Sequence, residues 1–151
     1  MAVHANKDVI DVLNDLIETA KDGQYGFDNC AERVKSLQLR QTLNQRAADC
    51  RSAVTELQSL VARNGGEAAE HGTVLGALHR GWVSVKDMLT VDSDHAVLEE
   101  CERGEDAALA RYRKALKAEL PADIRAVITR QMAGAQTNHD QVKMLRDATH
   151  T

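Results

Sequence analysis

Apolar residues recur every three or four positions along most of the chain, and one such stripe carries a carboxylate. Between residues 98 and 115 the stripe consists of Leu98, Cys101, Glu105, Ala108, Tyr112 and Ala115. This spacing keeps one face of an α-helix toward the protein interior. A buried carboxylate is costly unless it is paired, hydrogen-bonded, protonated or bound to a metal. The sequence therefore predicts a polar site around Glu105 inside a helical bundle.

The composition favours packed helices and argues against several classes of protein. The 151 residues include one proline, with 3% aromatic and 43% hydrophobic residues, which favours helices over sheet. We expect a single domain over residues 1–151. A formal net charge of −4 provides no basic surface, so we expect no nucleic-acid partner. Without a signal peptide or a membrane-length apolar segment, we expect a cytoplasmic protein with no membrane partner. Three cysteines without CxxC spacing are expected to be reduced, buried thiols: Cys30, Cys50 and Cys101.

Five helical segments follow from the apolar periodicity and from the turn residues. The second segment ends at Gly65-Gly66, a strong C-terminal stop, and Pro121 begins the last one at its preferred first-turn position. The first segment begins near Asn6 or Asp8, either of which could cap it. The predicted helices cover about 6–34, 38–64, 73–89, 92–119 and 122–148.

The connections between these segments predict the topology. Tight turns near residue 36 and at Pro121 make two antiparallel helix pairs. A long crossover over residues 65–91 joins the pairs and contains the short helix 73–89. If the crossover returns the chain along the bundle, the first and last helices run parallel. The prediction is an all-α, ferritin-like four-helix bundle with a short additional helix in the long connection.

Polar residues from the four long helices fall near one level of this bundle. Facing residues of an antiparallel pair have a nearly constant index sum, which places Glu18 opposite Glu56 and Glu102 opposite about position 138. The layer resembles a di-iron carboxylate site, in which two helices each give a Glu and two each give Glu-x-x-His. The residues near this level are Glu18, Glu56, Glu102, Glu105, Gln136 and His139.

This ligand set is partial. The second helix has no histidine in register with Glu56, and Gln136 stands where the pattern expects a glutamate. Iron, manganese or zinc would suit the mixed carboxylate and imidazole donors that are left. The predicted metal ligands are Glu102, Glu105 and His139, with Glu18, Glu56 and Gln136 as weaker candidates.

Each predicted ligand also has a structural interpretation. Charged residues beside a helix stripe are usually solvated, which favours the surface for Glu18 and Glu56. For His139, a hydrogen-bonded structural role is favoured over ligation. Glu105 lies on a regular stripe, so we expect it to be buried with or without a metal. Its partners in a metal-free protein would be Arg103, Arg111, Gln131 or His139.

Trp82 and a pair of glycines are best explained by packing. Trp82, the only tryptophan, is expected to fill one edge of the bundle with its N–H hydrogen-bonded, in preference to forming a subunit contact. Gly23 and Gly26 lie inside the first predicted helix, where glycine is unfavourable. Two glycines one turn apart indicate a close helix approach or a local bend.

Three motifs give the chain a recognisable pattern. They are Leu16-Ile17-Glu18-Thr19 followed by Asp22-Gly23, then Gly76-Ala77-Leu78-His79-Arg80-Gly81-Trp82, and Glu100-Cys101-Glu102-Arg103-Gly104-Glu105-Asp106. With these motifs, from about residue 7 to 148, the chain resembles a bacterial four-helix-bundle family of unknown function in the ferritin-like superfamily. The resemblance implies a ferritin-like fold and a bacterial, cytoplasmic origin, and it supplies no established substrate or activity.

Three functional hypotheses follow. The leading one is a ferritin-like protein whose partial mid-bundle site binds one iron, manganese or zinc ion. The alternative is a non-catalytic, metal-free scaffold or stress-related interaction protein whose buried polar residues set helix register, and which forms a homo-oligomer. The third, a small-molecule binding bundle, needs a cavity that a sequence does not show. The chain has no complete catalytic or di-iron ligand set, so the sequence assigns no enzyme activity.

Overall fold

Four long α-helices make up nearly all of the structure, a computed structural model that describes residues 2–68, 82 and 93–149. The predicted helix 73–89 lies outside the described residues. The last helix has the predicted bounds, and the first begins before the predicted caps Asn6 and Asp8, so that prediction of its start is wrong. The helices are α1 (Ala2–Arg33), α2 (Leu37–Arg63), α5 (Asp94–Leu116) and α6 (Ala122–Ala148).

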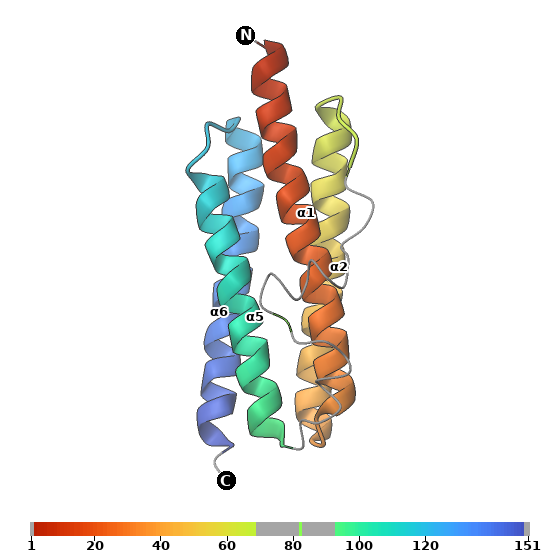
Figure 1. The fold of residues 1–151 in the computed structure, drawn as a ribbon, viewed down its shortest axis with the longest axis vertical. Helices are drawn as coiled ribbons and strands as arrows, with labels where there is room; N and C mark the ends of the chain where they lie inside the picture. Colours follow the sequence, from red (N-terminus) through yellow and green to blue (C-terminus); the bar gives the residue numbers. More distant parts are fainter. Residues whose placement is uncertain (1, 69–81, 83–92, 150–151) are drawn as a thin grey trace.

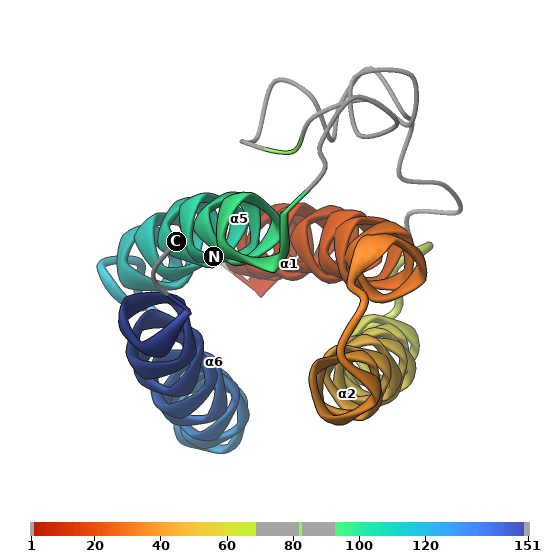
Figure 2. The ribbon, with the colours of Figure 1, turned by 90° about the horizontal axis from the view of Figure 1, so that it is seen from below.

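The helices form two antiparallel hairpins that pack through α1 and α5 (Figure 1). The first and last helices run in the same direction, as expected for a crossover that returns along the bundle. Viewed end-on, α2 lies against α1 and α6 against α5, whereas α2 and α6 stand apart (Figure 2). On this side of the bundle the two helix backbones pack less closely than in the other three pairs, and side chains join them.

Local side-chain contacts set the helix ends. The Ser36 hydroxyl accepts a hydrogen bond from the backbone N–H of Leu39 at 3.3 Å, and the Ser93 hydroxyl accepts one from Ala96 at 3.1 Å. Each serine thereby satisfies a backbone N–H that the first turn of a helix leaves without a partner. After α2, Gly65 adopts a left-handed φ of 77°, which confirms the predicted stop.

A carboxylate ties the two hairpins together at one end. Asp94, the first residue of α5, accepts hydrogen bonds from the backbone N–H groups of Lys35 and Ser36, at 2.7 Å and 3.2 Å. These two residues form the turn between α1 and α2. The start of the second hairpin thus completes the turn of the first.

The apolar core consists of two clusters at different levels of the bundle. One cluster contains large aliphatic side chains of all four helices, such as Leu13, Leu57, Leu109 and Ile128. The other surrounds the aromatic ring of Phe27. The large side chains that are almost completely buried are Phe27, Leu13, Leu16, Ile17, Leu43, Leu57, Leu60, Leu98, Leu109, Ile124 and Ile128.

Trp82 packs between α1 and α5 and accounts for two glycines. Its ring makes an edge-on contact with Phe27, with ring centroids 5.0 Å apart, and the residue is 4% exposed. A Cβ added to Gly26 would lie 2.2 Å from the indole, and one added to Gly104 would lie 2.3 Å from it. The predicted packing role of Trp82 is confirmed. At Gly26, the close neighbour is the Trp82 side chain and not the backbone of another helix. Gly23 is close to α2 instead, because a Cβ there would lie 2.9 Å from the Cys50 Sγ atom.

Candidate functional site

Glu105 is buried as predicted, with 1% of its surface exposed, and is held by side chains from two other helices. Arg46 on α2 donates from Nε to Oε2 and from Nη2 to Oε1, both at 3.0 Å. Asn138 on α6 donates to Oε2 at 2.5 Å. A two-pronged guanidinium–carboxylate pair with a further donor is a strong arrangement for a buried charge. We refer to Arg46, Glu105 and Asn138 as the Glu105 network.

Among the described residues, the hydrogen-bond partners of Glu105 are Arg46 and Asn138, and none of its four predicted partners is among them. Arg103 pairs with Glu100, and Arg111 pairs with Asp15 at 3.4 Å. The sequence missed Arg46 because that residue lies beside the apolar stripe of α2, where arginines are usually solvated. Burial lowers the pKa of Arg46, but the negative charges of ionised Cys50 and of Glu105, together with the hydrogen bonds to Glu105, outweigh burial, so the net shift is upward.

A second polar network joins α2, α5 and α6 farther along the bundle. Gln131 donates to Glu56 Oε1 at 2.8 Å, and Arg130 pairs with the other Glu56 oxygen. The Tyr112 hydroxyl donates to Gln131 Oε1 at 3.0 Å. Burial raises the pKa of Tyr112 well above its ordinary value, which keeps it a hydrogen-bond donor. We refer to Glu56, Tyr112, Arg130 and Gln131 as the Glu56 network.

Two of the three main predicted ligands, Glu102 and His139, lie close together on the surface formed by α5 and α6. Glu102 and Asp106 on α5 and His139 on α6 each offer one ligand atom, and these atoms all lie within 4.8 Å of one another. His139 Nε2 is 2.7 Å from Asp106 Oδ1, and His139 Nδ1 is 3.2 Å from Asp140 Oδ1. Glu102 also pairs with Arg146. The sequence missed Asp106, although it lies one turn after Glu102 on the same helix face.

The remaining predicted ligands lie elsewhere in the bundle. Glu105 belongs to its own network and is not in the group with Glu102 and His139. Glu56 bridges α2 to α6 and Glu18 lies half-buried on α1. Gln136 is exposed and donates to Asp140 at 3.0 Å. The single mid-bundle layer predicted from index sums is therefore divided among separate groups of residues.

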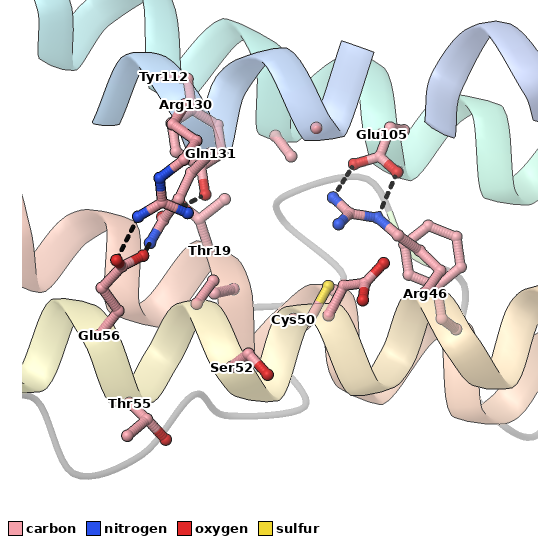
Figure 3. Close-up of a pocket in the computed structure, with 18 of the residues that line it drawn as sticks. Thr19, Arg46, Cys50, Ser52, Thr55, Glu56, Glu105, Tyr112, Arg130 and Gln131 are labelled. Atoms are coloured by element: carbon pink, nitrogen blue, oxygen red, sulfur yellow. Dashed lines mark hydrogen bonds and ion pairs between the residues drawn. The ribbon is translucent and has the colours of Figure 1, made fainter. Parts of the chain in front are cut away.

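A cleft of about 730 Å³ lies between the two polar networks, with walls from all four helices. Figure 3 shows the Glu56 network on one side of the cleft and Arg46 with Glu105 on the other. Cys50 also lines the cleft, and burial raises the pKa of its thiol to about 12. The predicted thiol state of the three cysteines agrees with the structure, in which all are free and buried.

The fold is similar to that of a known ferritin-like protein. A solved structure of a mutant of Mycobacterium smegmatis Dps1 matches with a TM-score of 0.80 and 15% identity, over 95% of this chain and 97% of that one. At this identity the match shows the fold alone. The curated proteins contain no significant match. Among the described helices, none has both the length and the apolar character needed to cross a membrane. A family model matches residues 8–118, and the chain therefore belongs to the family described as "Domain of unknown function (DUF2383)".

Proposed function

We propose that the protein binds one divalent cation, iron, manganese or zinc, through Glu102, Asp106 and His139 on the α5–α6 surface. The observation that carries this proposal is that three donor atoms from two helices lie within 4.8 Å of one another. Two carboxylates and an imidazole suit all three metals. Asp106 takes the place that Glu105 has in the sequence-based prediction, because Glu105 already receives three hydrogen bonds from protein donors.

The surroundings of the three donors fit a weak to moderate site with room for water. Asp106 is 60% exposed, while Glu102 and His139 are mostly covered. Three protein ligands beside solvent leave coordination positions for water molecules. A cation would replace the contact of His139 with Asp106 and would compete with Arg146 for Glu102. Arg146 should therefore lower the affinity of the site for a cation.

The test is a calorimetric titration of chelator-treated protein with Zn²⁺ and Mn²⁺, and with Fe²⁺ without oxygen. We expect one ion per chain, and at least about a tenfold loss of affinity for His139→Ala or Asp106→Asn, as for a lost ligand. Arg146→Gln should bind more tightly. Glu105→Gln is the matched control, since it alters a carboxylate outside the group. Equal binding by wild type and His139→Ala would exclude this site.

A second candidate function is a metal-free scaffold in which the Glu105 network sets helix register. It is favoured by the complete pairing of Glu105 with protein donors from α2 and α6. Buried polar groups specify register in some helical assemblies. This function predicts a homo-oligomer and no bound metal, and light scattering together with elemental analysis would test it. The cytoplasmic location and bacterial origin stay predictions.

A further inference from the structure

The cleft between α2 and α6 has the size and position of a ligand-binding site. Its volume of about 730 Å³ falls within the range of roughly 300–1,000 Å³ typical of small-molecule sites. Because α2 and α6 stand apart, side chains alone must fill the space between them (Figure 2). Small residues leave that space open, and those that line it are Ala20, Gly23, Ala53, Gly104, Ala108 and Gly134.

Aromatic side chains gather at this cleft in a chain that has very few. The sequence contains one Phe, one Trp and two Tyr, and three of these four residues line the cleft: Phe27, Trp82 and Tyr112. These rings are 1%, 4% and 5% exposed, so only small parts of them reach the cleft, where they add apolar surface to its wall. The few aromatic residues of the chain are therefore concentrated around this cleft.

The two polar networks mark the ends of the cleft (Figure 3). Arg46 and Glu56 are ten positions apart on α2, which corresponds to about 15 Å along a helix. The lining includes two arginines and three acidic residues, so its formal charge is −1. Both arginines are already paired with glutamates. Such a lining can accept hydrogen bonds from a ligand, and it disfavours an organic anion.

We propose that this cleft binds a neutral and largely apolar small molecule, up to about 15 Å long as limited by the helical rise between the two networks. The small apolar residues of the lining would contact it, and Arg46 and the Glu56 network would hydrogen-bond polar atoms at its two ends. This site is separate from the proposed metal site, because no residue of the Glu102, Asp106 and His139 group lines the cleft.

The first test uses two pyrene probes that differ in charge. The full-length protein is titrated with 1-pyrenemethanol, which is neutral, and with 1-pyrenecarboxylate, which is an anion. Trp82 is the only tryptophan, so energy transfer from its emission to pyrene reports binding near the cleft. We expect saturable transfer with one neutral probe per chain, and roughly tenfold weaker binding of the anion because like charges repel. Absence of saturable transfer, or tighter binding of the anion, would overturn the proposal.

The second test fills the cleft from α6. Gly134 lines the cleft, and a Cβ added to it meets no atom within 4 Å, so we expect Gly134→Leu to fold with its side chain in part of the cleft. Ala133→Leu controls for added apolar bulk, since Ala133 is exposed and does not line the cleft.

We expect Gly134→Leu to weaken binding of 1-pyrenemethanol by at least about tenfold, because its side chain takes the space in which the probe would make its contacts. Binding by Ala133→Leu should stay close to wild type. Circular dichroism would verify that each variant is folded. Unchanged binding by Gly134→Leu would place the probe elsewhere and overturn the proposal. So would a dimer that binds no probe, because a second copy would then be the occupant of the cleft. His139→Ala should bind the probe normally, which separates this proposal from the metal site.

Discussion

Arg46 and Glu105 connect α2 to α5 across the interior through two parallel hydrogen bonds of 3.0 Å each. The pair lies at one end of the cleft. The Arg46 guanidinium also lies over the Phe27 ring, 5.7 Å from its centroid. One arginine thus contacts both a charged partner and an aromatic face, which is a typical use of arginine over lysine.

Removal of Glu105 should destabilise the bundle. Glu105→Ala leaves the Arg46 charge largely buried without its partner, and we expect a loss of about 3 kcal/mol in the free energy of unfolding, measured by urea denaturation. Asp106→Ala on the same helix is the control, with a change below about 1 kcal/mol because its carboxylate is exposed. The double variant Arg46→Met with Glu105→Leu should recover most of the loss. A single variant as stable as wild type would show that the pair contributes little.

Gly26→Ala should destabilise the protein despite the higher helix propensity of alanine. The added methyl would overlap the Trp82 indole, and overpacking of this kind costs about 1–3 kcal/mol. Gly134→Ala, on an open helix face, should instead stabilise by up to about 1 kcal/mol. Thermal denaturation of the two variants would give shifts of opposite sign. The same sign for both would contradict the position of Trp82.

Stability should decrease at alkaline pH because a buried thiol must ionise. Burial raises the pKa of Cys50 from 9.0 to about 12, so the folded state holds a proton that the unfolded state loses. The contribution of the protonated Cys50 thiol to the free energy of unfolding is complete below pH 9 and is lost as the pH rises to 12. Urea midpoints between pH 8 and pH 11 should fall for wild type and fall less for Cys50→Ala. A residual slope is expected, since burial also raises the pKa of Cys101 and Tyr112.

A bound cation should stabilise the folded protein. At a free metal concentration about 100 times the dissociation constant, mass action adds about 2.7 kcal/mol, which appears as a higher melting temperature. The effect should diminish as the pH falls, because protons compete with the metal for its ligands. Differential scanning fluorimetry with Zn²⁺ would measure both effects. The same shift in Asp106→Asn would show that the metal binds elsewhere.

Helical periodicity predicted the four long helices and the burial of Glu105, because each depends on a repeat that spans many residues. The tight turns near residue 36 and at Pro121 predicted how the helices pair. The partner of Glu105 could not be predicted in this way. Arg46 reaches its target from beside a stripe, and the length of its side chain makes its position on the helix a poor guide to its contacts. Asp106 was missed for a related reason. Its side chain is largely exposed on α5, and it comes close to His139 only because α5 packs against α6 in the folded protein.

The cleft was beyond sequence reasoning for a different reason. Ala and Gly at interior positions are equally consistent with helices in close contact and with helices held apart. Only the distance between α2 and α6 decides between these cases, and that distance depends on the two polar networks and on the packing of α1 against α5. Glu56 and Glu105, two of the carboxylates that suggested a metal centre, instead bridge helices on either side of this space.

The contact of Asp94 with the turn at Lys35 and Ser36 bears on the order in which the chain acquires its structure. A nascent polypeptide that has emerged only as far as α2 lacks the acceptor for two amide hydrogens of its own first bend. Those amides would exchange readily with solvent until the later half of the chain docks. The amides of Lys35 and Ser36 should therefore become protected from exchange only when the start of α5 has reached this turn.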